Sequence, residues 1–218
     1  MKDFLPLMLD LSGKEVVIFG GGDVGERKAS LFADHSKVTL ISREFTPKLT
    51  DLFENKRIKL IKVKDLTENE IRQYMRNAFI VIPATNDTLL NEKIAAVAGE
   101  TGKLVNRVDD LGDIIVPSII QRGDIVIGIS TLGQSPTLSR YIRMKFEEVI
   151  TPRFANMARL QNEFRGLLKS TVHDQKKRKE ILWNIINDND VWTAFDESYE
   201  KAFKVALKHI DRIGEHNV

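Results

Sequence analysis

The sequence predicts an α/β fold with a parallel sheet, followed by a small β-hairpin segment and a helical C-terminal domain. In the first half, short apolar runs alternate with helical patterns, which is typical of a parallel α/β sheet. A glycine-rich turn joins the first apolar run to the first helical pattern. Beyond about residue 131 the patterns are helical only. We therefore expect three regions, at residues 1–113, 114–150 and 151–218.

The first strand is expected at residues 14–19, where an unbroken apolar run suits a parallel strand covered on both faces. Three glycines at G-x-G-x-x-G spacing follow, and they open a helix expected at residues 23–33. Gly20 allows a tight turn, Gly22 lets backbone N–H groups approach a pyrophosphate, and Gly25 lets the helix pack close to the strand. Phosphates would then lie on the positive end of the helix. The candidate cofactor-binding residues of this turn are Gly20, Gly22, Asp23, Val24 and Gly25.

Such a glycine spacing also occurs in purely structural turns. Here a strand leads into it and a helix leads out of it, which favours a Rossmann-like, NAD-binding domain at residues 1–113. A second strand is expected at residues 38–41, and its end bears on the choice of cofactor. NAD-binding domains place an acidic residue about 20 positions after the glycines, where it holds the ribose hydroxyls.

Three polar residues follow that second strand as further candidate cofactor-binding residues. Ser42 stands where the acid is expected, Arg43 could meet the 2′-phosphate of NADP, and Glu44 lies one or two positions late. Arg43 could equally be a solvated loop residue. The sequence therefore predicts a nicotinamide dinucleotide and leaves NAD against NADP open.

Further strands are expected at residues 58–63, 79–82 and 103–106, separated by helices at residues 67–76 and 91–100. Thr67 and Glu70 have the spacing of a capping box. Thr85 and Asn86 follow a strand, and therefore lie at the carboxyl edge of the sheet, where ligands bind in such folds. Both are candidate cofactor-binding residues, although they could also serve the turn and cap the next helix.

The second half begins with two apolar β runs, at residues 114–121 and 125–130, joined by a turn at residues 122–124. Four helical segments follow, at residues 137–150, 153–170, 175–187 and 191–213. Their apolar stripes are more typical of core packing or dimer contact than of catalysis. The basic run at residues 176–179 is expected to be a solvated face, with anion binding as the minority interpretation.

Composition and spacing exclude several classes of function. The 218 residues contain no cysteine, which rules out disulfides, thiolate metal sites and cysteine nucleophiles and fits a reducing compartment. The four histidines are scattered, so no metal site is expected. No serine-hydrolase or Walker A pattern is present. With a net charge of +2, no signal peptide and no membrane span, we expect a cytoplasmic protein that binds neither nucleic acid nor membrane.

Four blocks of the sequence occur in an order that resembles a known family. They are residues 20–29, residues 106–109 (Asn-Arg-Val-Asp), residues 117–123 (Pro-Ser-Ile-Ile-Gln-Arg-Gly), and residues 130–136 with 138–140. They are similar to the precorrin-2 dehydrogenases, which include the N-terminal part of siroheme synthase and the yeast-type bifunctional precorrin-2 dehydrogenase/sirohydrochlorin ferrochelatase. The resemblance covers roughly residues 3–150, and the helical C-terminus matches in type and length only.

This resemblance implies that precorrin-2 is oxidised to sirohydrochlorin, with NAD⁺ taking a hydride, in sirohaem or other tetrapyrrole biosynthesis. It also implies a homodimer, with residues 114–150 as the dimerisation segment. Some family members also insert Fe²⁺, so a bifunctional dehydrogenase and ferrochelatase is one alternative. The others are a non-catalytic Rossmann nucleotide sensor, which has no need for the later blocks, and a tetrapyrrole carrier without redox activity.

The resemblance places Asp109 at the position of the family's functional aspartate. A carboxylate there could accept the proton that a reduced tetrapyrrole loses together with the hydride. Turn capping is the alternative role, and neighbouring Asp110 is the residue most easily confused with it. Because the tetrapyrrole substrate carries eight carboxylates, basic residues should line its pocket, and the weak candidates are Arg107, Arg122, Arg140 and Arg143.

The sequence departs from the pattern of the bacterial fusion enzymes at two points. Thr131 stands where that pattern has a regulatory serine, and it keeps the hydroxyl. Leu132 stands where that pattern has a glycine, so any conformation with positive φ is more costly there. No methyltransferase domain follows the helical segments, and we therefore do not expect the chain to make precorrin-2 itself.

Overall fold

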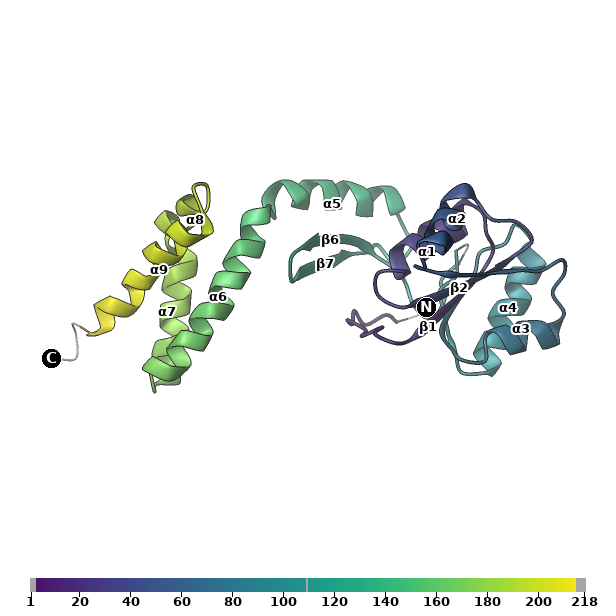
Figure 1. Ribbon diagram of the computed structural model, residues 1–218, viewed down its shortest axis with the longest axis horizontal. Coiled ribbons are helices and arrows are strands. Elements are labelled where there is room, and N and C mark those ends of the chain that lie inside the picture. Colours follow the sequence, from purple (N-terminus) through teal and green to yellow (C-terminus); the bar gives the residue numbers. More distant parts are fainter. Residues whose placement is uncertain (1–2, 109, 215–218) are drawn as a thin grey trace. The chain divides into compact units, whose positions relative to one another are not determined.

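The computed structural model describes residues 3–108 and 110–214 (Figure 1). The chain forms two compact units, Met1–Val116 and Pro117–Val218. The first unit contains a five-stranded parallel sheet with helices, and the second contains a two-stranded antiparallel hairpin and further helices. The predicted fold class is therefore confirmed. The predicted division into residues 1–113, 114–150 and 151–218 stays a prediction.

The sheet of the first unit has the strand order β3-β2-β1-β4-β5, and all of its pairings are parallel. The strands lie within two residues of their predicted positions. They are β1 (Glu15–Phe19), β2 (Lys37–Ser42), β3 (Lys59–Lys62), β4 (Ala78–Pro83) and β5 (Leu104–Val105). The helices are α1 (Asp23–Phe32), α2 (Pro47–Glu54), α3 (Glu68–Tyr74) and α4 (Thr88–Glu100).

Helices cover both faces of this sheet, as the apolar run of β1 predicts (Figure 1). Val16 and Ile18 point to the face where α1 and α2 supply Ala29, Phe32 and Leu49. The alternate residues of β1 point to the opposite face, which packs against α3 and α4. Neither face of β1 is exposed to solvent, which explains its continuous hydrophobic sequence.

Helix α2 is not among the sequence predictions, although its start signal is present. Thr46 is the N-cap residue, and its side chain accepts a hydrogen bond from the Leu49 N–H at 3.4 Å. Pro47 occupies the first turn, where its missing N–H costs nothing. The helix has only eight residues and buries Leu49 alone. So short a segment carries a weak apolar period, and the cap is the informative signal.

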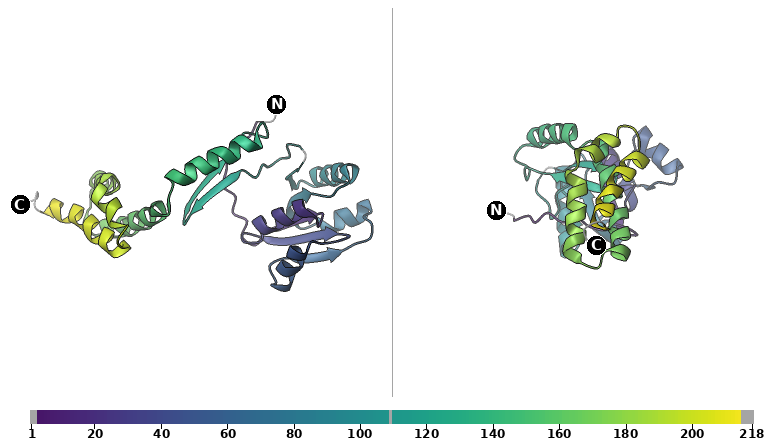
Figure 2. Two further views of the ribbon diagram at one scale, coloured as in Figure 1. Left: turned by 90° about the horizontal axis from the view of Figure 1, so that it is seen from above. Right: turned by 90° about the vertical axis from the view of Figure 1, so that its left-hand side faces the viewer.

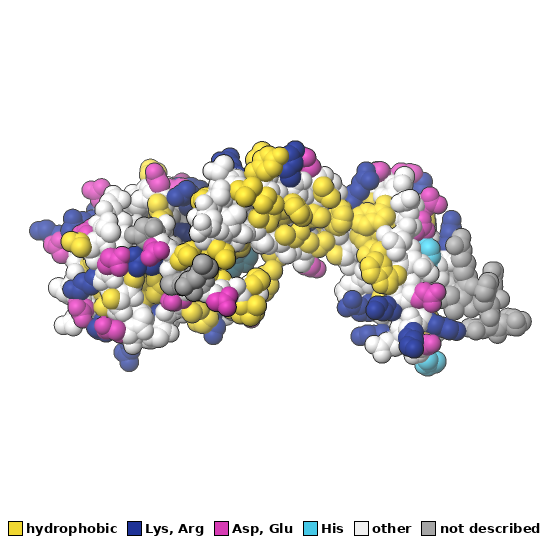
Figure 3. All heavy atoms as spheres, turned by 180° about the vertical axis from the view of Figure 1, so that it is seen from behind, with side chains coloured by type: hydrophobic (Ala, Val, Ile, Leu, Met, Phe, Trp, Pro, Cys, Tyr) yellow, Lys and Arg dark blue, Asp and Glu magenta, His cyan; other side chains and the backbone are white. Residues whose placement is uncertain are grey.

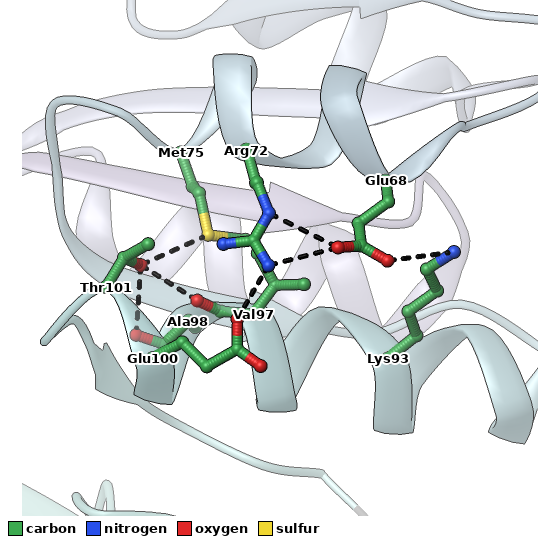
Figure 4. A network of polar contacts seen from close by, with 8 residues as sticks. All are labelled: Glu68, Arg72, Met75, Lys93, Val97, Ala98, Glu100 and Thr101. Atoms are coloured by element: carbon green, nitrogen blue, oxygen red, sulfur yellow. Dashed lines mark hydrogen bonds and ion pairs between the residues drawn. The ribbon is translucent and has the colours of Figure 1, made fainter.

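The capping box predicted at the start of α3 is confirmed. The Thr67 side chain accepts a hydrogen bond from the Glu70 N–H, and the Glu70 carboxylate accepts one from the Thr67 N–H at 2.8 Å. Figure 4 shows the polar contacts that then join α3 to α4. Arg72 donates to Glu68 at 3.0 Å and to Glu100 at 2.6 Å. The hydrogen bond from Arg72 holds the pKa of Glu68 below its ordinary value.

The turn after β1 depends on glycines at which a side chain has no room. Gly20 has a φ of +127°, and a Cβ there would lie 2.1 Å from the Ala84 carbonyl oxygen. A Cβ on Gly25, inside α1, would lie 2.1 Å from the Gly20 carbonyl oxygen. At Gly22, by contrast, a Cβ would meet no atom within 4 Å. Helix α1 therefore lies directly against the turn, and only Gly22 faces open space.

The second unit begins with β6 (Ser118–Arg122) and β7 (Ile125–Ile129), which pair in the predicted antiparallel hairpin. Figure 2 shows α5 (Pro136–Val149) lying alongside this hairpin. The connection to α5 contains Leu132 in the left-handed conformation, with a φ of +51°, which is strained for a residue with a side chain. The Thr131 hydroxyl is engaged there, since it accepts a hydrogen bond from the Ser135 N–H at 3.0 Å.

Four further helices complete the second unit: α6 (Pro152–Thr171), α7 (Gln175–Asn187), α8 (Asn189–Ala194) and α9 (Tyr199–Gly214). They share one apolar core. Its fully or almost fully buried members include Met157, Leu160, Phe164, Leu168, Ile181, Ile185, Val191, Ala194, Ala202 and Ala206. Packing of apolar stripes at helical spacing is what the sequence predicts for these segments.

The single helix predicted at residues 191–213 is wrong, because the chain breaks between α8 and α9. Asp188 ends α7 and caps α8, where its side chain accepts a hydrogen bond from the Asp190 N–H at 2.8 Å. It also lies 2.7 Å from His209 Nε2 on α9. Burial alone would raise the pKa of Asp188, but the hydrogen bonds from His209 and the Asp190 backbone hold it below its ordinary value. One carboxylate thus ties three helices together.

We predict that Gly25→Ala lowers the free energy of unfolding by about 2–3 kcal/mol, because the added methyl group overlaps the Gly20 carbonyl oxygen. Gly22→Ala is the matched control, since its backbone is extended and its Cβ has space. We expect it to change stability by less than about 0.5 kcal/mol. Urea denaturation of both variants measures the difference. Equal stability of the two variants would contradict the close packing of α1 on the turn.

Candidate functional site

A cleft of about 600 Å³ opens at the carboxyl ends of four strands of the first unit. The loops after β1, β2, β3 and β4 form its walls. The chain runs from β1 outward to β2 and β3 and then returns to the other side of β1 as β4. This is the topological switch point of a doubly wound sheet, where the loops separate and a ligand has room to bind.

Seven of the ten predicted cofactor-binding residues line this cleft: Gly20, Gly22, Ser42, Arg43, Glu44, Thr85 and Asn86. The other three, Asp23, Val24 and Gly25, form the first turn of α1 beside it. The cleft is also lined by residues that sequence reasoning missed, notably Gly21, Phe45, Thr46, Lys64, Asp65 and Asp87. Their common signal is position, since each stands in the glycine turn or follows a strand of the sheet.

Helix α1 begins at the cleft with its first backbone N–H groups uncapped by any side chain. Its N-cap residue is Gly22, which has no side chain to offer. The other helices of the first unit each have a side-chain cap: Thr46 for α2, Thr67 for α3 and Asp87 for α4. Free N–H groups at the positive end of a helix are suited to bind a phosphate group. With the open space at Gly22, this end of α1 fits the pyrophosphate of a dinucleotide.

One of the two acidic side chains in the first turn of α1 is balanced by a lysine. Glu26 lies in the first turn of α1, 3.4 Å from Lys48 Nζ on α2. A hydrogen bond from the Thr46 side chain holds the pKa of Glu26 below its ordinary value. Glu26 therefore stays ionised but is paired, and its charge opposes the approach of an anion less than a free carboxylate would.

Arg43 and Asp65 form an ion pair inside the cleft. Arg43 Nη2 lies 2.8 Å from Asp65 Oδ1, and Arg43 Nε donates to the Lys64 carbonyl oxygen at 2.7 Å. Both side chains are about three-quarters exposed, at 75% and 74%. The guanidinium is thus held between the ends of β2 and β3 with its charge compensated. Asp65 follows a predicted strand, but its pairing with Arg43 depends on two loops that are distant in sequence.

The loop after β4 is held by an amide from α4 as well as by its own turn, in which the Thr85 hydroxyl accepts a hydrogen bond from the Asp87 N–H at 3.2 Å. Asn91, on α4, accepts hydrogen bonds from the Thr85 hydroxyl at 2.7 Å and the Thr85 N–H at 3.0 Å. It donates in return to the Thr85 carbonyl oxygen at 2.9 Å. Asp87, not Thr85 or Asn86, caps α4. The exposed Asn86 side chain has no hydrogen-bond partner in the described part of the chain, and it is available to a ligand.

Two polar residues follow β5: Asn106, whose amide is buried, and the basic residue Arg107. Asn106 donates through Nδ2 to the Ile114 carbonyl oxygen at 3.0 Å, while its buried Oδ1 has no protein partner within residues 3–108 and 110–214. Arg107 pairs with Glu92 on α4, with one contact at 3.2 Å. Asp109, the predicted catalytic residue, lies outside the described residues. Its predicted role therefore stays a prediction.

The remaining basic candidates belong to the second unit. Arg122 donates to the Gln121 carbonyl oxygen at 2.9 Å, and Arg143 pairs with Glu147 at 2.8 Å. Arg140 is exposed. Within the described residues no group of three or more histidines, aspartates or glutamates could hold a metal ion, and no helix there is long and apolar enough to cross a membrane.

Comparisons with known proteins agree with this geometry. The family described as "Putative NAD(P)-binding" matches residues 7–118, which contain the whole cleft. Over 203 residues the chain is 50% identical to a protein named "Precorrin-2 dehydrogenase" from Methanosarcina barkeri, covering 92% of this chain and 91% of that protein.

Two further comparisons extend this relationship. "Siroheme synthase 2" of Yersinia pestis is 34% identical over 180 residues, which cover 81% of this chain but only 37% of that longer protein. A solved structure titled "SirC, precorrin-2 dehydrogenase" aligns with a TM-score of 0.74 over 96% of this chain and 100% of that one. At 24% identity, that alignment supports the fold. The domain match and the near full-length identity together show that the chain belongs to the precorrin-2 dehydrogenase family.

Proposed function

We propose that this chain oxidises precorrin-2 to sirohydrochlorin with a nicotinamide dinucleotide as hydride acceptor. The observation that carries the proposal is a dinucleotide-sized cleft at the switch point of the sheet, in a chain 50% identical to a precorrin-2 dehydrogenase over most of its length. When bound, the nicotinamide ring takes up the hydride that the tetrapyrrole gives up. The residues of the chain have to bind the two reactants, orient them and accept the accompanying proton.

The proposed cofactor-binding residues are those predicted from the sequence: Gly20, Gly22, Asp23, Val24, Gly25, Ser42, Arg43, Glu44, Thr85 and Asn86. The uncapped N-terminus of α1 would hold the pyrophosphate through backbone N–H groups. The loop after β2 would hold the adenosine ribose, since it lies on the same wall of the cleft. Thr85 and Asn86 lie on the opposite side of β1, after β4, toward the nicotinamide half.

We further propose that the Arg43–Asp65 pair makes NAD⁺ the preferred cofactor over NADP⁺. A free arginine at the end of β2 would attract the 2′-phosphate of NADP⁺. Here the Asp65 carboxylate, 2.8 Å away, already occupies the guanidinium and would repel that phosphate. NAD⁺ has a neutral 2′-hydroxyl at this place. It therefore needs no free guanidinium and is not repelled by the Asp65 carboxylate.

Asp109 is the proposed acceptor of the proton that leaves the tetrapyrrole. It stands four residues after the end of β5, next to Val108, and the equivalent loop ends of such sheets bear catalytic groups. An aspartate can accept a proton at neutral pH only when it is held close to the acidic C–H or N–H group of the substrate. Its neighbour Asp110 offers the same chemistry one position away, which makes it the natural control.

We propose a homodimer in which the hairpin and α5 form the interface, with residues 114–150 as the dimerisation segment. Figure 3 shows hydrophobic side chains gathered on one face of this part of the chain. The exposed apolar residues of the hairpin and α5 are Ile119, Val126, Leu138, Tyr141, Met144, Phe146 and Val149. So many large apolar side chains on one hairpin and one helix are typical of a surface that another protein covers.

The reaction is tested by mixing the purified protein with precorrin-2 and following NADH formation and sirohydrochlorin absorbance. We predict turnover with NAD⁺, and a loss of at least about 100-fold in Asp109→Ala, because the proton acceptor is removed. Asp110→Ala should retain activity within a few fold. No reduction with either dinucleotide, alongside tetrapyrrole binding, would overturn the proposal in favour of a carrier. The same protein with sirohydrochlorin and Fe²⁺ tests ferrochelatase activity against the enzyme-free rate.

The cofactor preference is tested with Asp65→Asn, which frees Arg43 without changing the size of the side chain. We predict that this variant raises the ratio of kcat/KM for NADP⁺ to that for NAD⁺ by about tenfold, because an exposed guanidinium then meets the 2′-phosphate. The double variant Asp65→Asn/Arg43→Ala should lose this gain. An unchanged ratio in Asp65→Asn would show that the pair does not select the cofactor.

The dimer interface is tested by Tyr141→Glu, which places a charge on the exposed apolar face of α5. We predict that the protein changes from dimer to monomer in sedimentation or light scattering at micromolar concentration, because the carboxylate would be desolvated in the interface. Lys204→Glu, at an exposed position of α9, is the control and should remain dimeric. A Tyr141→Glu protein that is still dimeric would place the interface elsewhere.

A further inference from the structure

The second unit contains a pocket of about 440 Å³ between α6 and α7, which we call the α6–α7 basic pocket. Five basic side chains line it: Arg165, Lys169, Lys176, Arg178 and Lys179. The remaining lining residues are Leu168, Leu182 and Gln175, and no acidic residue is among them. The pocket shares no lining residue with the cleft of the first unit. Its volume lies within the range of small-molecule sites.

The helical period of the two helices brings these residues together. On α6, Arg165, Leu168 and Lys169 are spaced three and four residues apart and therefore share one face. Leu168 is fully buried and forms part of the bundle core. The apolar base of the pocket is thus the edge of a packed core. The long stems of the basic residues rise around it and carry their charged ends toward solvent.

One of the five basic side chains is fixed by the backbone. Arg178 Nη1 donates to the Val172 carbonyl oxygen at 2.7 Å and to the His173 carbonyl oxygen at 3.0 Å, at the end of α6. The guanidinium is therefore held at the junction of the two helices before any ligand arrives. Its other N–H groups stay available, because those two bonds use only one of its nitrogen atoms. A positioned arginine suits the two oxygens of a carboxylate.

The charge of this pocket is uncompensated, unlike that of other basic residues on α5 and α6. Arg143, Lys145 and Arg159 each pair with a glutamate one turn away, at 2.8, 3.1 and 2.9 Å. None of the five pocket residues has an ion-pair partner in the described part of the chain. Asp174 lies next to Gln175 but is used at the N-terminus of α7, where it accepts the Lys176 N–H at 2.7 Å. Five unpaired cations around one hollow repel one another unless an anion joins them.

We infer that the α6–α7 basic pocket binds an organic polycarboxylate with an apolar body. The five cations match several carboxylates at once, and the half-buried Leu182 with the apolar stems of the basic residues matches an apolar ring or chain between them. Trp183 follows Leu182 on α7 and is 56% exposed; it is not a lining residue, but its fluorescence can report a porphyrin bound in the pocket. The inference rests on the proposed function for one point, which is that a tetrapyrrole with carboxylate side chains is the reactant of this chemistry.

This pocket gives the chain a second tetrapyrrole site, whose lining residues differ from those of the cleft. The interaction would be salt-dependent, because four of the five basic side chains are exposed. A bare inorganic anion would satisfy the charges but leave Leu182 and the stems of the basic residues covered only by water. The site should therefore distinguish an aromatic polycarboxylate from pyrophosphate or citrate of comparable charge.

The test uses uroporphyrin I, an octacarboxylate porphyrin, titrated into the full-length protein by calorimetry and by quenching of Trp183 fluorescence. Lys176→Gln/Lys179→Gln removes two pocket charges, and Lys204→Gln/Lys208→Gln removes two exposed charges from α9 as the matched control. We expect the pocket variant to bind about tenfold more weakly at the site that quenches Trp183. The control variant should bind as the wild type does. The quenching should disappear in Trp183→Phe, which shows that the signal comes from Trp183.

Two results would overturn the inference. One is equal affinity in the wild type and the pocket variant. The other is displacement of the porphyrin by pyrophosphate at the same concentration, which would show charge attraction alone. Precorrin-2 oxidation is measured in parallel and should stay within a few fold in both double variants. A protein that binds uroporphyrin at the pocket but does not oxidise precorrin-2 would refute the proposed function and leave the pocket intact.

Discussion

The close approach of α1 to the end of β1 is the constraint on which the first unit depends. A Cβ on Gly25 would lie 2.1 Å from the Gly20 carbonyl oxygen, so the helix can pack there only because the side chain is missing. That contact brings the N-terminus of α1 to the centre of the carboxyl edge, beside the loops after β2 and β4. The backbone thereby places uncapped N–H groups at the cleft, where they can bind a phosphate group.

The cleft of the first unit and the α6–α7 basic pocket of the second unit differ in the balance of their charged residues. In the cleft, Arg43 is paired with Asp65, and the other charged residues that line it are Lys64, Glu44 and Asp87, so charges of both signs are mixed where a dinucleotide would lie. In the α6–α7 basic pocket the positive charges stand together without acids. A balanced wall favours a ligand through shape and hydrogen bonds, whereas an unbalanced one favours a ligand that brings several negative charges.

The two parts of the second unit differ in how they bury their apolar side chains. Its helices bury a continuous apolar core, which includes Phe164 and Ile185, while the hairpin and α5 leave large apolar side chains exposed. Tyr199 packs between Phe195 and Phe203, and burial raises its pKa to about 12. The bundle thus buries its apolar side chains within the chain, whereas the hairpin and α5 leave an exposed apolar surface of the kind that other proteins cover.

Local sequence patterns are enough to predict the parallel sheet, the hairpin, the capping box at Thr67 and seven of the residues that line the cleft, because each depends on local periods, caps or turns. Tertiary packing alone brings together Arg43 with Asp65 and Asp188 with His209, and it gathers the five cations of α6 and α7 around one pocket. It also divides the predicted last helix into α8 and α9. These contacts join residues far apart in the chain, and their partners are set by packing rather than by neighbouring sequence.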